Sequence, residues 1–177
     1  MAESFVNAQA RAAGIVTTNS AGAIGVTTNI ITGISTVGIS SGYIVDNSNY
    51  LMGTRVTRVD VSKVYVDRDS TNTSAASDQS VKFLGLTSAY TAGSKSILIG
   101  GTFANNTDSS VNLTVEVHDS STNTITAVAQ KIPVPTGSSF VITDAGKTLL
   151  ETSDSVRVYC DSANGIDATL SILKGVS

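Results

Sequence analysis

The side chains that could act as a nucleophile or as a general base are few. His118 is the only histidine and Cys160 is the only cysteine among the 177 residues. A Ser-His-Asp or Cys-His arrangement would have to form around His118, with Glu116 and Asp119 as neighbouring carboxylates. The chain lacks the Gly-x-Ser-x-Gly pattern of a nucleophile elbow, and strand alternation predicts that Cys160 points into a core. We therefore expect no catalytic residues and interpret His118 as a solvated strand residue.

The closest approach to a metal motif is residues 67–73, which carry oxygen side chains at alternate positions and are followed by Asp78. Asn72 stands where a calcium loop of this type needs glycine for its sharp turn, and Arg68 would cancel part of the negative charge. A solvated hydrophilic linker over residues 67–80 explains this composition better. We expect no bound metal.

Gly100 and Gly101 follow an apolar run, but they lack the third glycine and the helix of a dinucleotide-binding site. A single cysteine also excludes an intramolecular disulfide and a cysteine-based metal site within one chain. The sequence therefore predicts no cofactor.

Composition narrows the class of protein. Charged residues make up 14% of the chain, below the roughly 25% that is typical of soluble domains. The net charge of −3 and the pI of about 4.9 provide no basic field for nucleic acid. The N-terminus has no basic region before an apolar run, and no apolar run is long enough to span a membrane, so we expect neither a signal peptide nor a membrane partner.

The clearest local pattern lies at residues 97–117, where two apolar runs surround a turn-rich loop at residues 105–110. We expect a hairpin with a long loop. The second strand alternates with a period of two, so one face should meet a core and the other should meet water. The inward residues are Val111, Leu113, Val115 and Val117, and the outward residues are Asn112, Thr114, Glu116 and His118.

The chain is expected to be all-β, with an N-terminal extended arm and a small β meander followed by an antiparallel β-sandwich. The sandwich should occupy residues 81–177, where strands recur at the spacing of such folds and the segment around Pro133 and Pro135 forms a corner. The small β module, with strands at residues 43–45, 53–59 and 63–66, and its linker should occupy residues 42–80.

Residues 1–41 are interpreted as the arm, in which residues 3–13 could form a short helix rich in alanine. Residues 12–45 contain no charged side chain, and such a β-prone segment invites pairing with a neighbouring molecule. The alternative is a run of ordinary strands within one domain. The assembly interface is predicted at Ile15, Val16, Ile24, Val26, Ile30, Ile31, Ile34, Val37 and Ile39.

Two stretches resemble structural proteins of tailed bacteriophages. Residues 42–77, with Gly53-Thr54-Arg55-Val56 in their second strand, look like a small β module of such proteins, although Gly42-Tyr43 replaces the usual Gly-Asp. The second half resembles a β-sandwich domain of tailed-phage virions, cyanobacterial phages among them, although Thr152-Ser153 replaces the usual Ala-Gly. The residues that carry the second resemblance lie at 98–100, 104–105, 133–137, 150–151, 154–158 and 167–173.

These resemblances imply a virion component that is assembled in the host cytoplasm. The expected function is that of a non-enzymatic structural protein, an accessory subunit of the head (decoration or cement) or of the neck or tail, held in the particle by its arm. Its partners would be other virion proteins and copies of itself, in a homo-oligomer. The alternative is a host-surface or glycan-binding module of a tail fibre or baseplate. Carbohydrate sites usually need flat aromatic platforms, and the chain has no tryptophan.

Overall fold

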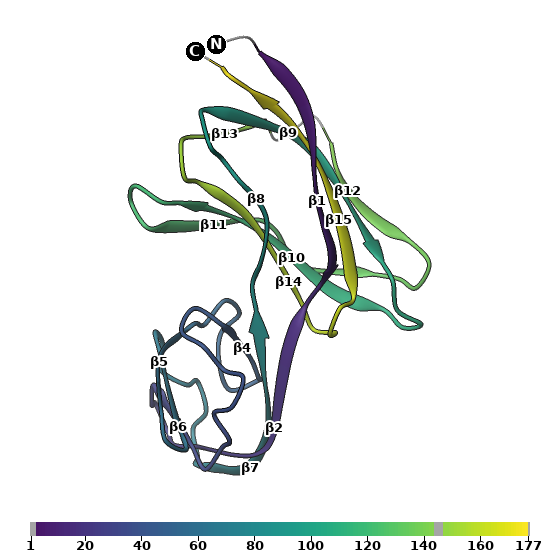
Figure 1. Ribbon diagram of the computed structural model, residues 1–177. Coiled ribbons are helices and arrows are strands. Elements are labelled where there is room, and N and C mark those ends of the chain that lie inside the picture. Colours follow the sequence, from purple (N-terminus) through teal and green to yellow (C-terminus); the bar gives the residue numbers. More distant parts are fainter. Residues whose placement is uncertain (1–2, 144–146, 177) are drawn as a thin grey trace. The chain divides into compact units, whose positions relative to one another are not determined.

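The computed structural model describes residues 3–143 and 147–176, and within these ranges the chain forms strands and turns and no helix. The predicted all-β fold class is confirmed. The chain divides into two compact units (Figure 1). The barrel unit is Val16–Gly85, and the sandwich unit combines Met1–Ile15 with Leu86–Ser177.

The sandwich unit consists of two antiparallel sheets. The first sheet contains, in order, β1 (Ser4–Ala13), β15 (Ile166–Lys174), β9 (Ser96–Asn105) and β12 (Ser139–Ile142), with β13 (Thr148–Leu150) also paired to β9. The second contains, in order, β11 (Thr124–Val134), β10 (Val111–Asp119), β14 (Ser155–Cys160) and β8 (Thr87–Thr91). The inward residues of both sheets form one apolar core, in which Phe103, Leu113 and Leu170 are fully buried.

The expected helix at residues 3–13 is wrong, because these residues form β1 and pair with β15 along almost their whole length. Val6, Ala8 and Ala10 pack partly buried against the core, while the residues between them are exposed. This period of two is already visible in the sequence, and burial against a finished sheet outweighs the helix propensity of alanine.

The expected hairpin at residues 97–117 is also wrong, because β9 and β10 belong to different sheets. The loop between them crosses from one sheet to the other and is held by Asn105, whose side chain is buried. Its Nδ2 donates hydrogen bonds to the carbonyl oxygens of Ser109 at 2.7 Å and Val134 at 2.8 Å. Its Oδ1 accepts from the backbone N–H of Thr107 at 2.8 Å. Local turn chemistry alone does not distinguish this arch from a hairpin.

The barrel unit is a sheet in the order β4 (Ile44–Asp46), β7 (Ala76–Gly85), β2 (Ile15–Ile24), β3 (Ile30–Thr32), β6 (Lys63–Val66) and β5 (Val56–Asp60). Its two end strands also meet. The N–H of Val45 donates to the carbonyl of Thr54 at 2.9 Å, and the N–H of Val56 donates to the carbonyl of Tyr43 at 2.8 Å. The sheet therefore closes into a small barrel around Phe83 (Figure 1).

The boundaries of the two units differ from the expected segments 1–41, 42–80 and 81–177. Within the described ranges the predicted arm is divided, because β1 completes the sandwich while β2 and β3 complete the barrel. The predicted solvated linker is instead an ordered loop that leads into β7. Ser70 is 4% exposed, its Oγ donates to the carbonyl of Gly25, and its N–H donates to the carbonyl of Thr28.

Candidate assembly surface

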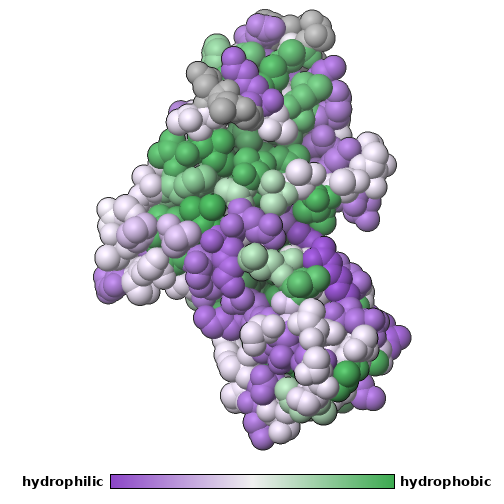
Figure 2. All heavy atoms as spheres, turned by 180° about the vertical axis from the view of Figure 1, so that it is seen from behind, coloured by the Kyte–Doolittle hydropathy of each residue, from purple (hydrophilic) through white to green (hydrophobic). Residues whose placement is uncertain are grey.

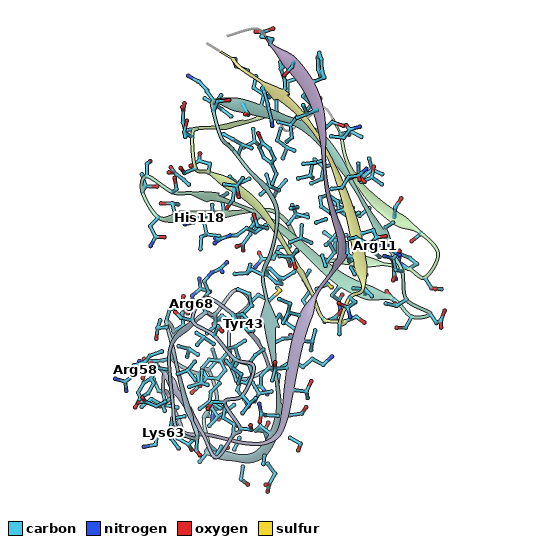
Figure 3. All side chains as sticks on the ribbon, in the orientation of Figure 1. Arg11, Tyr43, Arg58, Lys63, Arg68 and His118 are labelled. Atoms are coloured by element: carbon cyan, nitrogen blue, oxygen red, sulfur yellow. The ribbon has the colours of Figure 1, made fainter. Side chains whose placement is uncertain are left out.

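The side chains singled out for catalysis have hydrogen-bond partners elsewhere in the fold. His118 lies on the outer face of β10, where its Nε2 is 3.1 Å from Oδ1 of Asn123 (Figure 3). Asp119 instead accepts from the N–H and hydroxyl of Ser121 in the following turn, at 2.8 and 2.7 Å. Cys160 faces the core as predicted and is 0% exposed, and burial raises the pKa of its thiol. Its Sγ donates to the carbonyl oxygen of Ser162 at 3.1 Å.

The outer face of β10 is more buried than its alternation suggests. The expectation that Glu116 meets water is wrong, because its side chain is 2% exposed. It lies opposite Arg157 of β14, with Arg157 Nε 3.1 Å from Glu116 Oε1. Thr114 is also buried, and its hydroxyl accepts the N–H of Lys131. A central strand is flanked on both sides, so its long polar side chains can be covered by those of its neighbours.

The first acidic residue of the predicted linker binds the protein's own backbone. Asp67 Oδ1 accepts the N–H of Arg55 at 2.7 Å, and Asp78 lies at the beginning of β7 with a positive φ of 52°. Among the residues that the structure describes, no group of three or more histidine, cysteine, aspartate or glutamate side chains could hold a metal ion.

The glycine pair in β9 serves close packing. A Cβ at Gly101 would lie 2.7 Å from Cδ2 of Leu170, and a Cβ at Gly100 would lie 2.7 Å from the carbonyl oxygen of Ile142. Gly101 thus leaves space for a core leucine, and Gly100 allows the backbone of β12 to come close.

The nine predicted interface residues divide between core and surface, and the buried ones are not available to a partner. Four lie in the barrel core: Ile24, Ile31, Ile34 and Ile39. Two are half-buried, Val16 and Ile30, and three are exposed, Ile15, Val26 and Val37. Apolar residues spaced by glycine and threonine are typical both of an interface and of a small closed barrel, because such a barrel also needs short β-prone strands with little charge.

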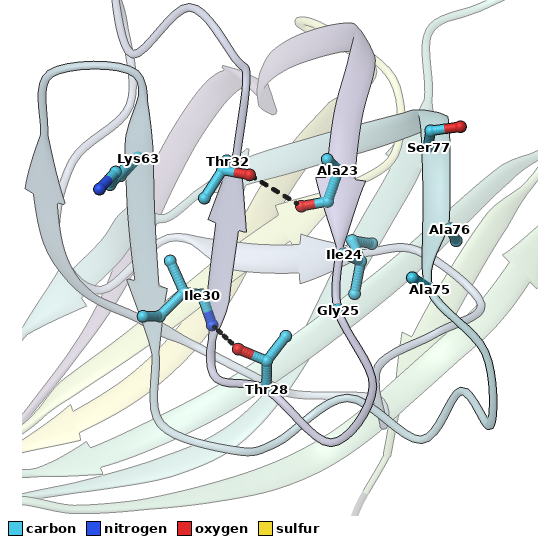
Figure 4. Close-up of a pocket in the computed structure, with 10 residues that line it drawn as sticks. All are labelled: Ala23, Ile24, Gly25, Thr28, Ile30, Thr32, Lys63, Ala75, Ala76 and Ser77. Atoms are coloured by element: carbon cyan, nitrogen blue, oxygen red, sulfur yellow. Dashed lines mark hydrogen bonds between the residues drawn. The ribbon is translucent and has the colours of Figure 1, made fainter.

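A shallow cavity of about 560 Å³ lies on the barrel unit (Figure 4). Most of the residues that line it have small side chains, which leave the space open, and Lys63 and Thr32 contribute polar groups to the lining. Thr32 is itself hydrogen-bonded to the carbonyl of Ala23 at 3.5 Å. None of the residues that line the cavity is aromatic, so it offers no flat platform for a sugar ring.

A row of apolar residues crosses the outer face of the five-stranded sheet, and nothing in the sequence analysis anticipated it. Strand pairing places Phe5 opposite Leu173, Leu173 opposite Ile97, and Ile97 opposite Leu149. The row extends over about 14 Å, three strand spacings of about 4.8 Å. Phe5 is 77% exposed and Leu149 is 49% exposed. The sequence shows that apolar residues alternate along these strands, but it does not show the register that aligns the four strands.

The space-filling view also shows hydrophobic residues gathered on the unit that carries the two termini (Figure 2). The other unit presents mostly neutral and hydrophilic residues in the same view. Exposed apolar area of this kind is typical of interaction surfaces in otherwise polar proteins. We therefore regard the outer face and edge of the five-stranded sheet as the candidate assembly surface.

No protein-family model, curated protein or solved structure matches this chain. Within the described ranges there is also no helix long and apolar enough to cross a membrane. The function must therefore be inferred from the residues and their arrangement.

Proposed function

We propose that this chain is a non-enzymatic structural protein of a tailed-phage virion, an accessory subunit of the head (decoration or cement) or of the neck or tail. Its partners are other virion proteins and further copies of itself, and it is assembled in the host cytoplasm. Attachment is through surfaces of the folded units rather than through a free arm, because residues 3–41 are folded within the chain.

The observation that carries this proposal is the position of the residues that resemble a phage β-sandwich. Leu98 and Leu170 belong to the sandwich core, and Asn105 holds the arch between the two sheets. Pro133 lies on the edge strand β11, where the missing N–H costs no hydrogen bond to a further strand. The residues that carry the resemblance thus lie at positions that a β-sandwich needs, which supports the proposal.

Asp154, a further residue of that pattern, supports the same proposal. It is 6% exposed and accepts from the N–H of Ser120 and the N–H of Glu151, both at 2.9 Å. This carboxylate joins two turns at one end of the sandwich. Its buried carboxylate is engaged in holding the fold, which favours a structural over a catalytic role.

The alternative of a glycan-binding module lacks a comparable observation. Tyr65 is an aromatic ring on the barrel surface, but the guanidinium carbon of Arg58 lies 3.9 Å from its ring centroid. That face of the ring is covered and is not open for stacking on a sugar. The cavity beside Lys63 has no aromatic lining either.

An antibody raised against the purified chain tests the proposal on phage particles banded in a density gradient. The chain should band with the particles, and immunogold labelling should mark the same part of each particle, either the head or the neck or tail. Antibody absorbed beforehand with purified chain is the control and should abolish the labelling. A chain that remains with the soluble proteins at the top of the gradient would contradict the virion role.

A further inference from the structure

The five-stranded sheet ends at β1, and in the part of the chain that the structure describes no strand pairs with the outer edge of β1. Residues 4–10 pair with β15 without a shift of register. A bulge follows, in which Ala12 has a φ of 54° and its N–H is bound by Oδ1 of Asp167 at 2.7 Å. On this edge residues 4–10 therefore have a regular row of backbone donors and acceptors with which no described strand is paired.

This edge lacks the features that usually prevent edge-to-edge association. Residues 4–10 contain no lysine, no proline and no bulge. The edge strand β11 in the other sheet has all three kinds of protection: Lys131 has a positive φ, Pro133 lacks a donor, and its pairing is shifted at two places. The edge strand β12 is only four residues long. The remaining edge strand β8 is five residues long and its pairing with β14 is shifted once, so the long, regular edge of β1 differs from the other edges of its unit.

The sequence of β1 is complementary to itself. The centre of residues 4–10 is Asn7, and a two-fold axis through one residue pairs odd positions with odd and even with even. Val6, Ala8 and Ala10 would remain on the core side of the joined sheet, as they are in the single chain. Glu3 and Arg11 are exposed, carry opposite charges and lie four residues on either side of Asn7.

We propose that β1 pairs antiparallel with β1 of a second copy about a two-fold axis at Asn7, joining the two five-stranded sheets into one. In this register Glu3 meets Arg11 of the second copy, Phe5 meets Gln9, and Asn7 meets Asn7. The backbone groups of the edge gain partners, and the exposed ring of Phe5 is partly covered. The two ion pairs fix the register more than they add affinity.

The interface is small, so the dimer of the purified chain should dissociate in the micromolar range, about 1–50 µM. This pairing goes beyond the proposed virion role and does not depend on it. The dimer is measured on purified protein, whereas the virion role is measured on particles. Failure of one therefore leaves the other standing.

Single cysteines test the register, since Cys160 is fully buried and does not compete. Asn7→Cys should give a covalent dimer under mild oxidation, because the two Cα atoms of the axial pair lie about 5 Å apart. Phe5→Cys is the matched control on the same strand. In the proposed register its two sulfurs are offset by four residues, about 13 Å, and should not join. Phe5→Cys combined with Gln9→Cys should join again.

A second control is Val128→Cys, an exposed position on the protected edge strand β11, which gives the background of random collisions. Linking of Asn7→Cys no faster than Val128→Cys would overturn the proposal. Efficient linking of Phe5→Cys alone would also overturn it, since it would place the axis at Phe5.

Charge exchange provides the test without cysteines. Glu3→Arg or Arg11→Glu should each weaken dimerisation about tenfold in sedimentation equilibrium, because each places like charges opposite one another twice. The double variant reverses both charges and should restore the original affinity. Circular dichroism should show that all three variants are folded. A wild-type chain that is monomeric at about 100 µM, or a dimer indifferent to both single exchanges, would refute the pairing.

Discussion

At the scale of single residues, Tyr50 brings a polar group into the barrel core. It is 6% exposed, and its hydroxyl donates to the carbonyl oxygen of Thr28 at 3.3 Å. Burial and, to a smaller extent, the negative charge of Asp69 raise the pKa of Tyr50 from 10.0 to about 12. The neutral phenol is therefore the form that the folded barrel requires.

This pKa shift predicts an alkaline weakness. A group whose pKa is higher in the folded than in the unfolded state contributes fully below the unfolded pKa, and the contribution is lost as the pH rises from 10 to about 12. Tyr50→Phe should remove much of the loss of stability in this pH window and cost about 1 kcal/mol near neutral pH for the missing hydrogen bond. Denaturant unfolding at several pH values measures both effects. An alkaline loss that is equal in the two proteins would contradict the assignment.

Substitution of Gly14 should destabilise the fold strongly, because Gly14 follows β1 with a φ of +124°. A Cβ there would overlap the carbonyl oxygen of Ser162 and lie 2.6 Å from Sγ of Cys160. Gly14→Ala should lower the free energy of unfolding by more than about 2 kcal/mol. Gly93→Ala is the matched control, because a Cβ at Gly93 would meet nothing within 4 Å. Similar unfolding midpoints for the two variants in urea would be evidence against the packing at Gly14.

The sequence predicts the face of a strand on which a side chain lies better than it predicts whether that face is buried. The inward position of Cys160 followed from simple alternation and is confirmed. Glu116 was assigned to water by the same rule, which fails because Arg157 reaches across from the neighbouring strand. Alternation gives the face of a sheet to which a side chain belongs, but it cannot tell whether that face is covered.

At the scale of elements, the pair of β10 and β14 predicts a coupling between Glu116 and Arg157. Their side chains are 2% and 19% exposed, so removing one charge leaves the other buried without its cross-strand counter-charge. Arg157→Met should lower the free energy of unfolding by about 3 kcal/mol, whereas Glu116→Leu combined with Arg157→Met should recover most of it. Denaturant unfolding of the four proteins in a double-mutant cycle measures the coupling.

The ion pair Arg58–Asp60 supplies the control, since its side chains are 59% and 50% exposed. Removing either of these charges should change the stability by less than about 1 kcal/mol. If Arg157→Met lowers the free energy of unfolding as little as Arg58→Met does, Glu116 and Arg157 are solvated and do not form a buried ion pair.

The strands of the second half could be predicted well because β-branched residues alternate there with turn residues at short intervals. Two of the short β-prone segments within the predicted sandwich, Thr148–Leu150 and Ser155–Cys160, form β13 and β14. Which strands pair could not be predicted. The hydrogen bond from Asn105 to Val134 and the pairing of β1 with β15 join residues that are far apart in the sequence. No pattern of neighbouring residues indicates such long-range contacts.

At the scale of the whole molecule, the chain is two β units rather than an arm followed by a module and a sandwich. The first unit closes its own sheet, and the second unit takes its edge strand from the N-terminus. The low charge of residues 12–45 predicts an intermolecular interface. Most of this segment instead belongs to the closed barrel, where Ile24 and Ile31 are in the core.

The claim most open to direct test is that residues 3–41 fold within their own chain. Hydrogen exchange followed by mass spectrometry measures it, preferably on the Glu3→Arg variant at low concentration, so that pairing between copies cannot protect β1. The amides of β1 that point toward β15, every second one along the strand, should exchange as slowly as their partners in β15, and those of β3 as slowly as those of β6, because each of these pairs shares its hydrogen bonds. Complete exchange of residues 4–32 within seconds, while β15 and β6 remain protected, would show a free arm and contradict the fold described here.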